Sequence, residues 1–209
     1  LATQAARDRY LRIRYLPEGS VSSNSAVEVC LCEDDYPGWL AIGDLAALTV
    51  AETPYTPVVR NRADIISRIP AAIAFTQTAL AQPNVYLWGG TLGPNFDCSG
   101  LVQTAFASVG VWLPRDAYQQ EAFTQPVAIA DLEPGDLVFF GPPHKATHVG
   151  LYLGNARYIH SSGKDQGHNG IAIDVLGADG SPVSQTYYAQ LRGAGRILQS
   201  YQPQAIATR

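Results

Sequence analysis

The stretch Asp97-Cys98-Ser99-Gly100-Leu101 governs how the rest of this chain is interpreted. A glycine-rich approach, Tyr86-Leu87-Trp88-Gly89-Gly90, leads into it, and Asp97 stands where a helix N-cap would stand. Apolar residues then recur at helical spacing before a stop at Gly110: they are Leu101, Val102, Ala105, Phe106 and Val109. The pattern predicts a helix that begins at Cys98.

Cys98 would therefore lie in the first turn of that helix. The N-terminal end of a helix carries partial positive charge from its unpaired N–H groups, which favours a thiolate over a thiol. We interpret Cys98 as a candidate nucleophile. A lone cysteine at a helix start is more often a packing residue, so the hypothesis depends on the partners that the rest of the chain supplies.

Composition excludes several classes of function. The chain has 209 residues, of which 46% are hydrophobic and 15% charged, as expected of a globular protein with one large or two modest domains. A net charge of −4 without a basic stripe argues against a nucleic-acid surface. No apolar run approaches the roughly 18 residues that a membrane span needs. We expect a monomer.

The ends and the cysteines of the chain add two expectations. The start, Leu1-Ala2-Thr3-Gln4, shows neither an initiator methionine nor a signal peptide, which leaves cytoplasmic and periplasmic locations open. Cys30 and Cys32 are two residues apart in a strand-like run, a poor geometry for pairing. The three cysteines therefore predict no disulfide framework.

Residues 1–54 read as a small all-β domain. Alternating runs at residues 10–15 and 26–32 are separated by the turn Pro17-Glu18-Gly19-Ser20, and Trp39-Leu40-Ala41-Ile42 opens another strand after a polar turn. Several short strands in about 50 residues suggest a barrel, and this part resembles a bacterial SH3-like domain. Residues 55–64 are interpreted as a linker, because Pro54 and Pro57 disfavour both helix and sheet interior there.

Residues 65–209 read as an α+β domain. A helical pattern covers residues 65–81, with Pro70 as a disturbance that divides it into two shorter pieces. After Gly110 the pattern changes to strands at residues 137–140, 147–153, 157–160, 170–175 and 193–198. A helical first half followed by an antiparallel sheet is typical of the α+β class.

Two of the four histidines are candidates for a catalytic base. His148 and His160 lie on adjacent strands of a predicted hairpin, and both numbers are even. They share a sheet face if the loop between the strands has an odd number of residues, as a three-residue loop Gly154-Asn155-Ala156 would. His144 and His168 lie in Pro-rich and Gly-rich loops, where we expect them to be solvated and assign them no role.

Residues 60–198 resemble the NlpC-type cell-wall peptidases, which have a compact papain-like fold. The matching motifs are Tyr86-Leu87-Trp88-Gly89-Gly90, Asp97-Cys98-Ser99-Gly100-Leu101, Leu113-Pro114-Arg115, Pro134-Gly135-Asp136-Leu137, His148-Val149-Gly150-Leu151-Tyr152 and Tyr158-Ile159-His160. The resemblance implies hydrolysis of murein stem peptides between γ-linked D-glutamate and a diamino acid such as meso-diaminopimelate. It also implies that no cofactor or metal takes part.

The same resemblance implies roles for four residues. Cys98 would be the nucleophile, His148 the base and His160 the polar residue that orients His148. The hydroxyl of Tyr86 would help to stabilise the oxyanion, together with a main-chain N–H at the start of the Cys98 helix. A core position is the alternative for Tyr86.

The substrate side rests on weaker signals. Arg115 could pair with a carboxylate of the stem peptide or form a structural ion pair. Asp97 and Ser99 flank the nucleophile and could contact substrate, although a cap explains Asp97 equally well. Tyr36, in a turn of the small domain, could meet the amino terminus of a stem peptide, in which case free stem peptides would be preferred to intact wall.

Three other interpretations stay open on the sequence alone. Cys98, His148 and His160 are all zinc-ligand types, although three dispersed ligands make a weak signature. A papain-like amidase or acyltransferase could use the same three residues. A non-catalytic cell-wall-binding protein could retain the fold, although an intact Cys-His-His set argues against it.

Overall fold

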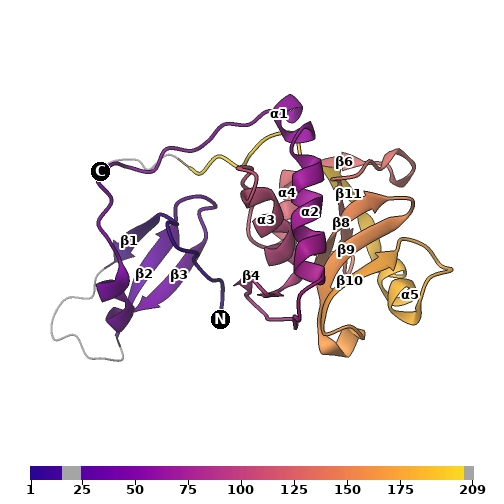
Figure 1. The fold of residues 1–209 in the computed structure, drawn as a ribbon, viewed down its shortest axis with the longest axis horizontal. Coiled ribbons are helices and arrows are strands. Elements are labelled where there is room, and N and C mark those ends of the chain that lie inside the picture. Colours follow the sequence, from indigo (N-terminus) through magenta and orange to yellow (C-terminus); the bar gives the residue numbers. More distant parts are fainter. Residues whose placement is uncertain (16–24, 205–209) are drawn as a thin grey trace.

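The computed structural model describes residues 1–15 and 25–204, so the predicted turn Pro17-Glu18-Gly19-Ser20 lies outside the described residues. Three short strands form the N-terminal sheet: β1 (Leu11–Tyr15), β2 (Ala26–Leu31) and β3 (Pro37–Ala41). They are antiparallel in the order β1-β2-β3 and are followed by a 3₁₀ turn, η1 (Ile42–Ala47). The small all-β module is thus present, and it lies beside the larger domain (Figure 1).

An extended segment joins the two parts. Residues 48–61 contain no helix or strand, and α1 (Arg62–Ile66) begins inside the last residues of the predicted linker. At the other end of the chain, the backbone after the last strand runs back toward the small domain (Figure 1). There the N–H of Tyr201 donates to the carbonyl of Trp112, and the N–H of Gln204 donates to Asp35.

The helices follow the sequence pattern closely. The predicted segment 65–81 is divided, as expected, into α1 and α2 (Ile69–Leu80), with Pro70 in the first turn of α2, where its missing N–H costs nothing. The cysteine helix, α3, spans Cys98–Ala107. The Asp97 carboxylate accepts a hydrogen bond from the N–H of Gly100 at 2.6 Å, which confirms the predicted cap.

A six-stranded antiparallel sheet forms the centre of the larger domain. Its strands are β6 (Gln125–Val127), β7 (Leu137–Phe140), β8 (His148–Gly154), β9 (Arg157–Ser162), β10 (Gly170–Val175) and β11 (Leu191–Arg196), in the order β10-β9-β8-β7-β11-β6. The shorter elements are β4 (Thr91–Leu92), β5 (Asn95–Phe96), α4 (Ala117–Phe123), η2 (Ile129–Asp131), η3 (Lys164–Gln166) and α5 (Pro182–Tyr188). The sequence pattern predicted neither α4 nor α5.

The sheet separates two apolar clusters. Alternate residues of the strands, such as Val149, Leu151 and Ile159, pack with α2 and α3 in the main core. The intervening positions, such as Phe140 and Tyr158, pack with Tyr187 of α5 in the second cluster. Figure 1 shows α2 and α3 on one side of the sheet and α5 on the other.

The β8–β9 hairpin sets the face on which the two candidate histidines lie. Its turn has two residues, Asn155 and Ala156, both at φ 52°, in place of the three-residue loop that we predicted. Positive φ at both positions is the pattern of a type I′ turn. An irregularity between Tyr152 and Gly154 inserts one more residue and restores the even register, so that Leu151 pairs with Ile159. The two even-numbered histidines therefore share a face, as predicted.

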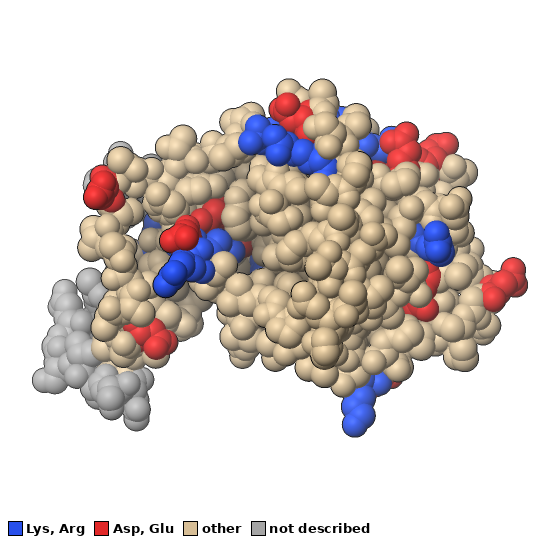
Figure 2. Space-filling view, viewed as in Figure 1, with Lys and Arg blue, Asp and Glu red and all other residues tan. Residues whose placement is uncertain are grey.

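Charged side chains are interspersed on the face seen in Figure 2, without a continuous basic patch. Within residues 1–15 and 25–204, no helix combines the length and the apolar character that crossing a bilayer requires.

Candidate active site

The two histidines on this face are in direct contact. Nε2 of His148 lies 2.7 Å from Nδ1 of His160, and both side chains are buried. Their rings cross at 84°, edge to face. His148 is the first residue of β8, an internal strand of the sheet, while His160 lies within the neighbouring strand β9. The structure thus brings together the two histidines that the sequence singled out.

A carboxylate that the sequence analysis did not single out lies behind His160. Oδ2 of Asp174, on β10, lies 2.9 Å from Nε2 of His160 and 2.8 Å from Nε2 of His168. The other oxygen accepts hydrogen bonds from the hydroxyls of Ser184 at 2.8 Å and Ser181 at 3.2 Å. Burial acts to raise the pKa of Asp174, but the hydrogen bonds from His160, His168 and Ser184 outweigh it and hold the pKa well below its usual range.

His168 is exposed in its loop, as expected, but its side chain also hydrogen-bonds to Asp174. His144 is exposed, as expected.

Cys98 lies at the N-terminus of α3, in the main core and next to the strand that begins with His148. The main-chain N–H groups of Val149 and Ser99 both donate toward its sulfur and lower its pKa. A charge on Cys98 would also act on the hydroxyls of Tyr86 and Tyr187, which places the sulfur among these groups. Cys98 therefore lies near the first residues of β8, on the face of the sheet that α2 and α3 cover.

The ionisation state of the thiol differs from the expectation. Burial and the nearby charge of Asp97 raise the pKa of Cys98 to about 12, despite the opposing N–H groups. Burial, together with His160, lowers the pKa of His148 well below its usual value. Both directions favour the neutral forms, a thiol at Cys98 and an uncharged imidazole at His148, because the solvation that a buried ion loses outweighs the field of a helix terminus.

Tyr187 of α5 covers the base. Its ring stacks on the His148 imidazole at a centroid distance of 4.3 Å and an interplanar angle of 25°. It also meets the His160 ring edge-on at 5.0 Å. Tyr187 is 4% exposed, so it excludes water from one face of the base. Sequence periodicity did not identify this residue because α5 was not predicted.

Tyr86 is half-buried in the loop before β4. Burial and the proximity of Cys98 raise its pKa, which keeps the phenol protonated and able to donate. The residue thus lies close enough to Cys98 for electrostatic interaction, as the oxyanion hypothesis requires.

Asp97, Ser99 and Arg115 form one buried cluster beside the nucleophile. Arg115 is 1% exposed. Its guanidinium donates two hydrogen bonds to the Asp97 carboxylate, at 2.6 and 3.1 Å, and one to the Ser99 hydroxyl at 3.0 Å. Its Nε donates to the hydroxyl of Thr3 at 3.0 Å. Asp97 also accepts from the N–H of Gly89 at 2.8 Å. This geometry favours the structural interpretation of Arg115, because its donors are engaged within the protein.

The small domain approaches the same region through its polar turn. The Tyr36 hydroxyl donates to the Asp116 carboxylate at 3.3 Å, and Asp34 accepts from the amide of Gln103 on α3 at 2.8 Å. Burial, together with the charge of Asp116, raises the pKa of Tyr36 to about 12. Tyr36 thus lies next to Asp116, the residue that follows Arg115.

One set of metal-ligand types occurs in the described part of the chain. The donor atoms of His160, His168 and Asp174 lie within 4.8 Å of one another. Nε2 of His160 and Nε2 of His168 each form a hydrogen bond with the Asp174 carboxylate. The three side chains therefore satisfy one another by hydrogen bonding. Of the three ligands of the zinc hypothesis, this cluster contains His160 but neither Cys98 nor His148.

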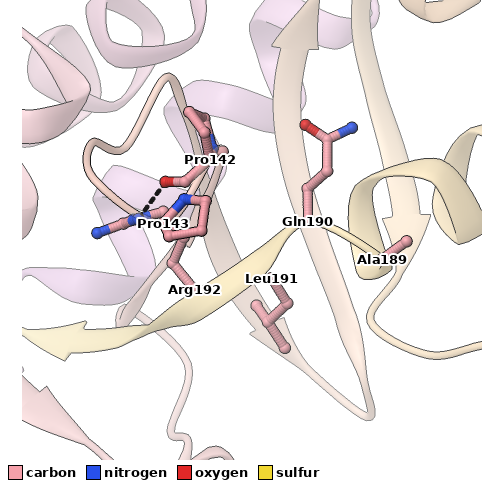
Figure 3. A pocket seen from close by; sticks show the side chains of 7 residues that line it. Pro142, Pro143, Ala189, Gln190, Leu191 and Arg192 are labelled. Carbon is pink, nitrogen blue, oxygen red and sulfur yellow. Dashed lines mark hydrogen bonds between the residues drawn. The ribbon is translucent and has the colours of Figure 1, made fainter.

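A shallow pocket lies where the loop after β7 meets β11, lined by residues 141–143 and 189–192 (Figure 3). The Arg192 guanidinium donates to the carbonyl of Pro142 across it, as Figure 3 shows, and pairs with Glu121 at 2.8 Å. Its charged group is thus already paired. None of Cys98, His148 and His160 lines this pocket.

A helix that bears a cysteine at its N-terminus, packed on an antiparallel sheet that presents a histidine pair, defines a papain-like α+β domain. Residues 83–192 match the NlpC/P60 family, and residues 1–45 match the bacterial dipeptidyl-peptidase Sh3 domain. The chain belongs to the NlpC/P60 family. Both the fold class and the SH3-like module predicted from sequence are confirmed.

Several curated relatives are named as murein enzymes. The Escherichia coli protein named murein DD-endopeptidase MepS/murein LD-carboxypeptidase is 32% identical over 158 residues, covering 72% of this chain and 81% of its own length. The Mycobacterium tuberculosis probable endopeptidase Rv2190c is 39% identical over 109 residues, 52% of this chain and 26% of its own length. The chain therefore spans about a quarter of that relative.

Solved structures support the same fold. An NlpC/P60 family protein from Bacillus cereus is 26% identical with a TM-score of 0.54, covering 89% of this chain and 53% of its own. The peptidoglycan hydrolase RipB of Mycobacterium tuberculosis is 28% identical with a TM-score of 0.51, covering 75% of this chain and 77% of its own.

Proposed function

We propose that this protein is a cysteine endopeptidase that hydrolyses murein stem peptides, with Cys98 as nucleophile, His148 as base and His160 as the residue that orients His148. The observation that carries the proposal is the 2.7 Å hydrogen bond between His148 and His160, at the strand end that Cys98 approaches. One relative named a murein DD-endopeptidase and another named a muramidase/DL-endopeptidase suggest the class of substrate.

The mechanism begins from the neutral thiol and imidazole. As the sulfur of Cys98 attacks the peptide carbonyl carbon, its proton passes to His148. The resulting oxyanion receives hydrogen bonds from the main-chain N–H at the start of α3 and from the Tyr86 hydroxyl. His148 then gives its proton to the leaving amine, and a thioester remains on Cys98. Water, deprotonated by His148, hydrolyses this thioester and regenerates the thiol.

The bond that we propose is the one between γ-D-glutamate and meso-diaminopimelate. The Bacillus subtilis relative, 46% identical over 81 residues, is named a bifunctional muramidase/DL-endopeptidase. The name of the Escherichia coli relative instead gives a DD-endopeptidase and an LD-carboxypeptidase, so cleavage beyond the diamino acid is the second candidate. Amidase or acyl transfer with the same three residues is the third.

On the substrate side, we propose that the amino end of the stem peptide meets Tyr36 and the Asp97–Ser99 side of the site. Tyr36 and Asp34 hold the small domain against residues on or near α3 and α4, and on this proposal the small domain limits how far a bound peptide can extend in that direction. Arg115 would act by fixing Asp97 and Ser99 rather than by binding a carboxylate itself. Free stem peptides would then be preferred to intact, cross-linked wall.

Mass spectrometry of defined peptides tests the proposal. The substrates are L-Ala-γ-D-Glu-meso-diaminopimelate with and without an acetylated amino terminus, a tetrapeptide ending in D-alanine, and a cross-linked dimer. We expect release of L-Ala-γ-D-Glu, and faster release from the free amine than from the acetylated peptide. Release of D-alanine or cleavage of the cross-link alone would support the second candidate, and no cleavage of any peptide would contradict the proposal.

A further inference from the structure

Asp174 is surrounded by hydrogen-bond donors that use both of its oxygens. Each oxygen accepts two hydrogen bonds, from His160 and His168 on one and from Ser181 and Ser184 on the other. The side chain is buried, and a buried carboxylate is stable as an ion only when it is satisfied in this way. The phenols of Tyr158 and Tyr187 and the imidazole of His148 also interact with it electrostatically.

The ionised carboxylate has no proton to give, and this dictates the protonation of the rings next to it. Nε2 of His160 must carry the proton in its 2.9 Å contact with Asp174. Burial lowers the pKa of His160, so the ring is neutral and its Nδ1 is an acceptor. The 2.7 Å contact then requires the proton on Nε2 of His148. Nδ1 of His148 is left with a lone pair and can accept the thiol proton.

We propose that Asp174 is a positioning residue, which sets the tautomers of His160 and His148 so that the remaining nitrogen of His148 is a base. The inference rests on the proposed function, because the base is needed only if Cys98 is the nucleophile. It adds a fourth residue, Asp174 of β10, to the three that the family resemblance supplied. In Ser-His-Asp hydrolases, replacing the aspartate by asparagine leaves the geometry intact but lowers kcat about 10⁴-fold through the wrong tautomer.

The proposal has a readout that needs no substrate. In ¹⁵N-labelled full-length protein carrying Cys98→Ala, long-range ¹H–¹⁵N correlation at pH 7.5 reports which nitrogen of each ring bears the proton, with His148→Gln and His160→Gln variants for assignment. We expect Nε2–H in both rings. A proton on Nδ1 of either ring overturns the proposal. Inactivity on murein peptides would contradict the proposed function but would leave this spectrum unchanged.

The Asp174→Asn variant tests the same point in catalysis, with Asp179→Asn, an exposed aspartate in the loop after β10, as the matched control. The asparagine amide can donate to Nε2 of His160 and move its proton to Nδ1. We expect kcat to fall about 10²-fold or more with KM changed less than threefold, and the control to behave as wild type. An Asp174→Asn variant within threefold of wild-type kcat overturns the proposal. Should this variant not fold, the spectrum of the Cys98→Ala protein decides.

Discussion

Nε2 of His148 and Nδ1 of His160 lie 2.7 Å apart, which joins the first residue of β8 to a residue within the neighbouring strand β9. His160 fixes one nitrogen of His148, and the stacked ring of Tyr187 fixes the plane. The base is therefore held in one orientation before substrate arrives.

Substitutions at position 160 should separate hydrogen bonding from bulk. In His160→Gln, an amide oxygen can accept from His148 while the amide nitrogen donates to Asp174, so we expect a loss in kcat of about tenfold. His160→Leu keeps the volume but offers neither group, and we expect a loss of about 10²- to 10⁴-fold, the usual range for general-base catalysis. Steady-state kinetics on a stem peptide checks both. Equal losses would mean that His160 acts only through packing.

The pH profile should reflect the neutral form of His148. Because burial and His160 lower the pKa of His148, the base stays unprotonated to below pH 6.5 and loses activity only as the pH falls through that lowered value. The acidic limb of kcat/KM should therefore lie below pH 6.5 in wild type and in the exposed-residue control His144→Gln. A limb above pH 6.5 would contradict a neutral resting imidazole.

The same buried histidines should make folding stability depend on pH. Their pKa values are lowered in the folded state, so above about pH 6.5 neither state binds the extra proton and no stability is lost. As the pH falls below that value, the unfolded chain takes up protons that the folded chain refuses. The free energy of unfolding should then fall by about 1.4 kcal/mol per pH unit for each histidine.

Urea denaturation between pH 7.5 and 5.5 measures this slope. His148→Gln removes one of the two histidines and should lower the slope by about half, whereas His144→Gln should leave it unchanged. A slope near zero in wild type below pH 6.5 would refute the account of the buried pair.

Asp97 should contribute more to stability than an ordinary helix cap. Asp97→Ala removes the cap of α3 and also leaves the buried Arg115 guanidinium without its carboxylate, a loss of about 3 to 5 kcal/mol. Asn61→Ala removes the exposed cap of α1, where we expect about 1 kcal/mol. Equal free energies of unfolding for the two variants would show that the Asp97–Arg115 pair contributes nothing beyond capping.

The sequence predicted the helix start at Cys98 and the shared face of His148 and His160, because helical spacing and strand parity are local properties. Asp174 was missed for a physical reason. It lies in the predicted strand 170–175. The register of that strand against β9 depends on the loop of residues 163–169, and the length and sequence of this loop do not specify the register. The observed register pairs Ala172 with His160 and places Asp174 on the same face.

The charge state of Cys98 could not be predicted for a related reason. The partial charge of a helix terminus can be inferred from the sequence, but the burial that opposes it depends on packing against β8 and Tyr187. Arg115 illustrates the same limit. Its motif predicts a charged residue near the site, and only the fold pairs that charge with Asp97.

The most direct test of the central claim is the turnover of a defined stem peptide by Cys98→Ala, measured by mass spectrometry at matched concentrations of folded protein. Cys32→Ala, which removes a buried thiol from the small domain, is the control. We predict no detectable product from Cys98→Ala and wild-type turnover per folded molecule from Cys32→Ala. Product formation by Cys98→Ala at a rate near that of wild type would contradict a thiol nucleophile at position 98.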